Sequence, residues 1–218
     1  NGRIVKEIID VVKSMAQSSI IIMVTNPLDI MTRLAYLISG IDRGRIIGMG
    51  GILDSVRFKY FISEKLKVKP YDINAYVIGE HGRYMIPLIR EAKVNGEKVI
   101  EIIDEKDARE IVERTKVAGA EIVSFLKTGS AYFSPSVCAA EIVEVVLNDK
   151  NNEYSICCNL EGEFGANNTA LNVPAIIGRR GIKKINEIEL NEEEVKIFKL
   201  AAKEVDEGIN TLREEGVL

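Results

Sequence analysis

The 218-residue sequence predicts an α/β protein in two parts: a parallel sheet layer in residues 1–50, and an α+β part with antiparallel strands and long helices in residues 51–218. Apolar residues make up 46% of the chain, so it can bury a sizeable core. The first part alternates helical apolar spacing with short, continuous apolar runs, which is typical of α/β layers. Beyond Gly50, hairpin signals and long helical patterns replace that rhythm.

The first part predicts helix, strand, helix, strand. Residues 2–16 carry apolar side chains at helical spacing, and residues 19–25, SIIIMVT, form a β-branched apolar run. Such runs are typical of parallel strands that are buried on both faces. An Asn-Pro pair ends this strand, after which residues 29–39 return to helical spacing and residues 45–50 predict a second buried strand.

The second part predicts mixed structure. The Asn95-Gly96 pair predicts a tight hairpin turn, and Asn191 with Glu194 forms a capping-box pattern. The predicted elements in chain order are a helix at 53–66, strands at 73–79, 85–94 and 97–103, a helix at 107–127, a break at 128–136, a helix at 137–149, strands at 154–165 and 172–181, and a helix from about residue 192.

Charge and cysteine content narrow the class of protein. The net charge is −4 without a basic block, so neither nucleic acid nor a membrane is expected as a partner. The three cysteines are odd in number and lack C-x-x-C spacing, which predicts reduced thiols in a cytoplasmic protein. With a single histidine in the chain, we expect no metal site. The sequence opens on Asn1 rather than Met, which we interpret as a piece of a longer protein.

Three short stretches contain candidate functional residues. Asn26 follows a buried strand, where ligands bind in open α/β sheets, but Asn-Pro is also a common turn pair. Asp54 and Arg57 share one helix face and are either a solvated ion pair or a carboxylate and a guanidinium with separate tasks. His81 follows a predicted strand and is either a proton-transfer group or a structural residue.

Read together, these stretches resemble the lactate/malate dehydrogenase family. VTNPLDIMT (residues 24–32), GILDSVRF (51–58) and GEHG (79–82) match three family signatures in order and at family spacing, and VPAIIGRRGI (173–182) resembles a fourth. The resemblance implies that the first part is the remainder of a Rossmann-type sheet, with residues 51–218 as the catalytic and substrate domain. It also implies an oxidoreductase that transfers a hydride between a nicotinamide cofactor, NAD or NADP, and a small 2-hydroxy or 2-oxo acid.

The roles below are those that the resemblance implies. His81 is the proton donor and acceptor, Asp54 its carboxylate partner, and Arg57 the partner of the substrate carboxylate. Asn26 contacts both the substrate and the cofactor. The remaining cofactor positions are Val24, Thr25, Asn1 and Met49.

The GSAYFSP stretch (residues 129–135) resembles malate dehydrogenases built on the lactate dehydrogenase plan, so malate is the expected substrate. Lactate or another 2-hydroxy acid remains an alternative. A third possibility is a non-catalytic remnant that retains an oligomerisation surface, because no G-x-G-x-x-G follows a strand. That absence indicates that the family's N-terminal third is missing and that residues 1–218 alone are inactive. The family resemblance further implies a homodimer or homotetramer.

One departure from the family pattern is Arg83, where an acidic residue is usual. It is either a solvated surface charge or an altered charge near the substrate.

Overall fold

The computed structural model describes residues 1–218. The helices are α1 (Gly2–Met15), α2 (Leu28–Ser39), α3 (Gly50–Leu66), α4 (Val99–Ile102), α5 (Glu105–Leu126), α6 (Phe133–Asn148) and α7 (Glu192–Glu214). The strands are β1 (Ile21–Met23), β2 (Ile46–Gly48), β3 (Ile73–Asn74), β4 (Val77–Gly79), β5 (Met85–Pro87), β6 (Lys93–Val94), β7 (Glu97–Lys98), β8 (Asn152–Glu161), β9 (Asn167–Gly178) and β10 (Gly181–Ile185).

The main sheet has the strand order β1-β2-β8-β9-β4-β5, and β10 pairs with β9. β1 and β2 are parallel, as the two apolar runs predicted, whereas every other pair in the sheet is antiparallel. The sheet crosses the boundary predicted near Gly50, because Gly48 of β2 is in register with Cys157 of β8. The division into two domains at residue 50 therefore remains a prediction.

A second, three-stranded sheet has the order β3-β6-β7. Asn95 and Gly96 join β6 to β7 with φ values of 51° and 93°. Two successive positive φ angles are the mark of a type I′ turn, so the predicted hairpin is confirmed.

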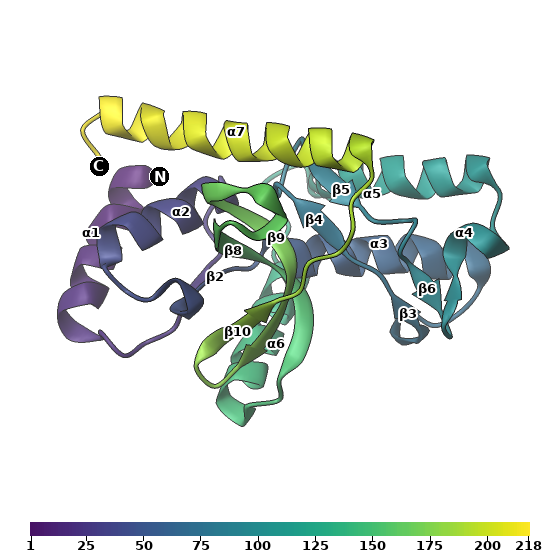
Figure 1. Cartoon of the computed structure of the whole chain (residues 1–218), viewed down its shortest axis with the longest axis horizontal. Coiled ribbons are helices and arrows are strands. Elements are labelled where there is room, and N and C mark those ends of the chain that lie inside the picture. Colours follow the sequence, from purple (N-terminus) through teal and green to yellow (C-terminus); the bar gives the residue numbers. More distant parts are fainter.

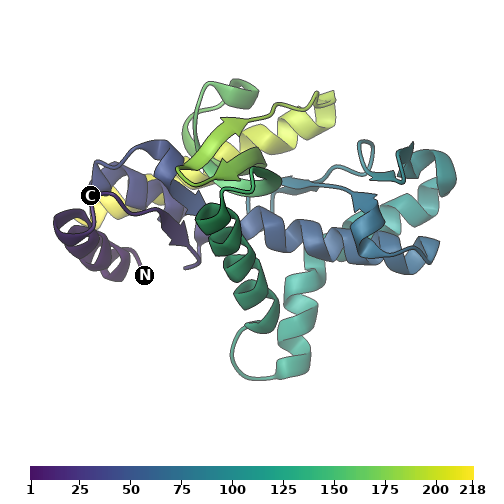
Figure 2. The same ribbon diagram turned by 90° about the horizontal axis from the view of Figure 1, so that it is seen from below.

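The helix α7 packs against elements from both sides of the predicted boundary at residue 50. It runs along one side, past α1 and α2 to β4 and β5 (Figure 1), and it packs against α2, β9, β4 and β5. Its apolar stripe lies in the main core: Phe198, Ala201, Val205, Ile209 and Leu212. The predicted capping box at its start is present. Both chain termini lie near α1, and α6 projects away from the body beside the end of α5 (Figure 2).

Several predicted elements were wrong in extent. The strand predicted at 85–94 is broken after Pro87, because Ile89 N donates to Pro87 O and Ala92 N donates to Leu88 O, which makes a turn. In the strand predicted at 97–103, residues 99–102 are helical instead, and Ile100 and Ile102 are exposed. The helix α6 begins at Phe133, inside the predicted break, because Pro135 falls in the first helical turn, where an N–H has no helical partner.

Two further differences concern the sheet. The strand predicted at 154–165 ends at Glu161 and is followed by a 3-10 turn, and β10 was not predicted at all.

All three cysteines are free thiols, as the sequence predicted. Cys157 and Cys158 are neighbours on β8. No helix is long and apolar enough to cross a membrane.

Candidate active site

His81 lies two residues beyond β4, at the end of the sheet. Its Nδ1 is 2.5 Å from Oδ2 of Asp54. A carboxylate can only accept, so Nδ1 carries the proton and donates to Asp54. The other ring nitrogen, Nε2, has no partner within the chain, and the side chain is 17% exposed. The imidazole is therefore fixed at one nitrogen and open at the other.

Asp54 and Arg57 lie in α3 and form an ion pair in which Asp54 is buried and Arg57 is partly buried. Nη1 of Arg57 donates to Oδ1 of Asp54 at 3.2 Å, and the two side chains are 12% and 1% exposed, respectively. The solvated-face interpretation of this pair is therefore wrong. Nε of Arg57 is buried without a hydrogen-bond partner. Unpaired buried donors are costly in a folded protein, so this guanidinium is suited to accept a further anionic partner.

The space around Arg57 depends on a glycine of the facing helix. A Cβ atom at Gly119 of α5 would lie 3.3 Å from Nη1 of Arg57. The two helices pack directly against each other. Gly119 therefore leaves room for the guanidinium between α3 and α5.

The electrostatics favour a protonated His81. Burial by itself lowers the pKa of His81, but the charge of Asp54 and its hydrogen bond outweigh burial and raise the imidazole pKa above its ordinary value. The charge of Asp29 acts in the same direction, and Arg57 opposes it. The ring can therefore exchange a proton near neutral pH.

A glycine lets the elements that carry these groups meet. A Cβ atom at Gly50, the first residue of α3, would lie 2.8 Å from Cβ of His81 and 2.4 Å from Cδ2 of Leu28. Leu28 begins α2, directly after the Asn26-Pro27 pair. The start of α2, the start of α3 and His81 therefore converge at Gly50.

The candidate cofactor residues lie at the carboxyl ends of the parallel strands. Val24, Thr25 and Asn26 are exposed directly after β1. The side-chain amide of Asn26 makes no hydrogen bond, while the backbone carbonyl oxygen of Asn26 accepts one from Nδ2 of Asn1 at 2.7 Å. An exposed apolar residue beside a free amide, at this end of a parallel pair, fits a planar ring that carries a carboxamide. Met49 is buried in the main core.

Two polar residues at the site were not predicted from the sequence. Asp29 accepts a hydrogen bond from the backbone N–H of His81 at 2.7 Å, and Asn172 donates to Asp29 at 3.1 Å. Burial raises the pKa of Asp29 to about 6. The one local signal for Asn172 is a lone amide within the apolar run TALNVPAII of β9. Arg83, in contrast, is exposed and lies over the Tyr84 ring.

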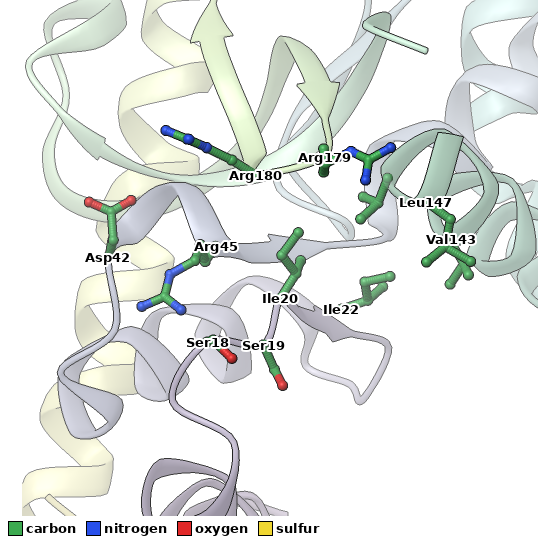
Figure 3. A pocket seen from close by; sticks show the side chains of 11 residues that line it. Ser18, Ser19, Ile20, Ile22, Asp42, Arg45, Val143, Leu147, Arg179 and Arg180 are labelled. Atoms are coloured by element: carbon green, nitrogen blue, oxygen red, sulfur yellow. The ribbon is translucent and has the colours of Figure 1, made fainter. Parts of the chain in front are cut away.

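A separate cavity of about 560 Å³ lies near the amino end of β1, away from Asn26. It is lined by residues of the segment before β1, of α6 and of the turn after β9 (Figure 3). Arg179 and Arg180 point to opposite sides in that view, so they do not converge on one ligand. No group of three or more His, Cys, Asp or Glu residues is arranged to bind a metal.

A histidine–carboxylate pair beside an arginine fits the chemistry of a 2-hydroxy-acid dehydrogenase, and comparison with known proteins identifies the family. Residues 1–48 match the family model for the lactate/malate dehydrogenase NAD binding domain, and residues 52–215 match that for the lactate/malate dehydrogenase alpha/beta C-terminal domain. The chain belongs to the lactate/malate dehydrogenase family.

Within this family, the similar curated proteins are malate dehydrogenases. The enzyme from Chlorobium phaeobacteroides (strain BS1) is 41% identical over 97% of this chain and 68% of its own length. The solved structure of the malate dehydrogenase from Aeropyrum pernix has a TM-score of 0.92 and 35% identity, covering 97% of this chain and 68% of that one.

Lactate dehydrogenases are close structural relatives. The enzyme from Cryptosporidium parvum, solved with lactic acid and nicotinamide adenine dinucleotide, has a TM-score of 0.94 and 32% identity, covering 98% of this chain and 69% of that one.

Proposed function

We propose that this chain carries the catalytic residues of a malate dehydrogenase, which interconverts malate and oxaloacetate with NAD. The observation that carries the proposal is the buried Arg57–Asp54–His81 arrangement with one imidazole nitrogen left open. The family membership and the malate dehydrogenase relatives support the substrate and the type of cofactor.

His81 moves the proton. In malate oxidation, Nε2 accepts the proton of the 2-hydroxyl group, and Asp54 stabilises the imidazolium that results. In oxaloacetate reduction, the imidazolium returns this proton to the oxygen of the 2-oxo group. The bond to Nδ1 keeps the ring in the tautomer that leaves Nε2 free to accept.

Arg57 binds the carboxylate next to the reacting carbon. Asp54 engages only Nη1, so the remaining guanidinium donors are free for two parallel hydrogen bonds to a carboxylate. Because Arg57 and His81 both contact Asp54, one side chain sets the distance between the substrate anchor and the proton-transfer group.

The proposed cofactor positions are Val24, Thr25, Asn26, Asn1 and Met49. When bound, NAD supplies the acceptor for the hydride that leaves the alcohol carbon. Val24 and Thr25 present an apolar and a polar surface to the nicotinamide ring, and the free amide of Asn26 is available to its carboxamide and to the substrate oxygen. Asn1 fixes Asn26 through the backbone, and Met49 supports the site from the core.

We also propose a homodimer or homotetramer. Val56 and Tyr60 of α3 are 46% and 50% exposed, on the helix that carries Asp54. Aromatic and apolar side chains on an exposed helix face are typical of subunit interfaces.

The test is steady-state kinetics of the complete protein with oxaloacetate and with pyruvate. Malate dehydrogenase activity predicts a higher kcat/KM for oxaloacetate, whereas a preference for pyruvate would favour a lactate dehydrogenase. His81→Asn should lower kcat by ~100- to 10,000-fold, the usual cost of losing a general acid–base group. NADH affinity, measured by fluorescence titration, should be nearly unchanged. Unaltered turnover in this variant would return His81 to a structural role.

A further inference from the structure

His81 is bound by two buried carboxylates at different atoms. Asp54 accepts from the ring, and Oδ2 of Asp29 accepts from the backbone N–H of the same residue at 2.7 Å. Asp29 lies in the first turn of α2 and is 3% exposed. A buried carboxylate is expensive to desolvate, so its placement against the backbone N–H of His81 requires compensating hydrogen bonds.

Asn172 connects this second carboxylate to the rest of the site. Its Nδ2 donates to Oδ1 of Asp29 at 3.1 Å and to the carbonyl oxygen of Gly79 at 2.9 Å. Its Oδ1 accepts from the backbone N–H of Gly51 at 2.6 Å. One buried side chain on β9 therefore joins α2, β4 and the first turn of α3.

These three bonds act close to the proton-transfer pair. Gly79 lies two residues before His81, and Gly51 lies three residues before Asp54. We infer that Asp29 and Asn172 are positioning residues, which fix the main chain of His81 and the start of α3 so that Nδ1 stays in hydrogen-bond contact with Asp54. This inference rests on the proposed role of His81 in proton transfer.

Asp29 also adds charge to the site. His81 faces Asp54 and Arg57 from α3 and Asp29 from α2, and the negative charge of Asp29 favours the imidazolium. Asp29 in turn faces Glu80 and, from β8, Cys157. With a pKa of about 6, Asp29 is ionised at neutral pH. Asp29 therefore acts through both geometry and charge, whereas Asn172 acts through geometry alone.

The readout is NMR, because the chain contains a single histidine. In the complete protein, prepared without a histidine tag, the imidazole signal that disappears in His81→Asn belongs to His81 and reports its pKa without any activity assay. Asp29→Asn keeps the shape of the side chain and removes its charge, so the His81 pKa should fall. kcat for oxaloacetate should fall by ~10-fold, while NADH binding stays unchanged.

Asn172→Ala leaves both carboxylates in place and should lower kcat by ~10-fold or more, again without a change in NADH binding. The matched control is Asn159→Ala. Asn159 is a buried asparagine on the neighbouring strand β8, and its side chain contacts Arg33 instead of the site. This variant should lose stability but keep the kcat and the His81 pKa of the parent.

Folded Asp29→Asn and Asn172→Ala variants with parental kcat and His81 pKa would overturn the inference and leave both residues with a stabilising role. If neither variant folds, hydrogen exchange of the His81 amide in the parent decides. Protection comparable to that of β9 supports the inference, and exchange at the rate of a free peptide overturns it. A parent without turnover of any 2-oxo acid would contradict the proposed function, whereas the NMR titration would still test the placement of Asp29.

Discussion

At the scale of single residues, the candidate site is joined by Asp54, which makes two side-chain hydrogen bonds. Asp54 accepts from both His81 and Arg57, so it orients the proposed proton-transfer group and the proposed substrate anchor together. Each partner restricts a different carboxylate oxygen. A substitution at Asp54 would therefore disturb both, while substitutions at Arg57 or His81 separate the two tasks.

Arg57→Lys tests the substrate anchor. Lysine keeps the charge but loses the planar, two-point grip on a carboxylate. We expect kcat/KM for oxaloacetate to fall by ~10-fold or more, from the loss of ~1.5–3 kcal/mol of charge-assisted hydrogen bonding. Steady-state kinetics beside an NADH titration should show unchanged cofactor affinity.

The control for this substitution is Arg83→Lys, on an exposed arginine near the same histidine. It should behave like the parent. Parental kinetics in Arg57→Lys would remove the substrate anchor, and a changed KM in Arg83→Lys would place Arg83 at the substrate entrance.

The raised pKa of His81 links stability to pH. Because the folded-state pKa lies above the unfolded value of about 6.5, the contribution of His81 is complete below ~6.5 and is lost as the pH rises through the folded-state pKa. Urea unfolding of the parent and of His81→Asn across this range should show that their difference in unfolding free energy declines with pH. A difference that is constant with pH would contradict the Asp54–His81 pairing.

The residues known from sequence and those missed differ in how their contacts arise. Asp54 and Arg57 are neighbours on one helix turn, so their spacing predicts contact. The bond between Asp29 and Asn172 joins residues 143 positions apart. No local spacing encodes such a contact, and Asp29 in the sequence looks like the ordinary acidic residue of a first helical turn.

At the scale of elements, local signals predicted those elements that local interactions decide. The Asn95-Gly96 turn and the capping box of α7 each depend on backbone geometry within four residues, and both were found. The segments at 85–94 and 97–103 have strand composition, but β5 ends at Pro87 and residues 99–102 form a helical turn. Tertiary contacts there overrode propensity.

Gly50→Ala tests how closely the elements meet. The added methyl group would collide with Cβ of His81 and with Leu28, so either α3 or the histidine must move. We expect a loss of ~1–3 kcal/mol in unfolding free energy from overpacking, together with a fall in kcat of up to ~100-fold. Thermal unfolding and oxaloacetate kinetics measure the two effects.

The comparison variant is Gly40→Ala at the end of α2. Gly40 has φ +65° and open space around it, so alanine there introduces backbone strain without a collision. This variant should be destabilised by ~1 kcal/mol with parental kcat. Equal loss of kcat in both variants would mean that destabilisation alone explains the effect at Gly50.

At the scale of the whole molecule, residues 1–218 contain the proposed proton-transfer and substrate-binding residues but no G-x-G-x-x-G pattern to bind a dinucleotide phosphate. We therefore expect residues 1–218 in isolation to bind NADH weakly and to turn over no oxaloacetate. Fluorescence titration of this polypeptide checks the expectation, and micromolar NADH binding would refute it.

The course of α7 has a consequence for how the molecule melts. Leu212 near its end packs against Gly2 of α1, and the start of the helix packs against β5. The last helix therefore contacts elements on both sides of residue 50, α1 before it and β5 after it. Neither side of that boundary can then open without releasing α7, so loss of structure should be all-or-none, and release of this one helix is the event that exposes both halves to proteolysis.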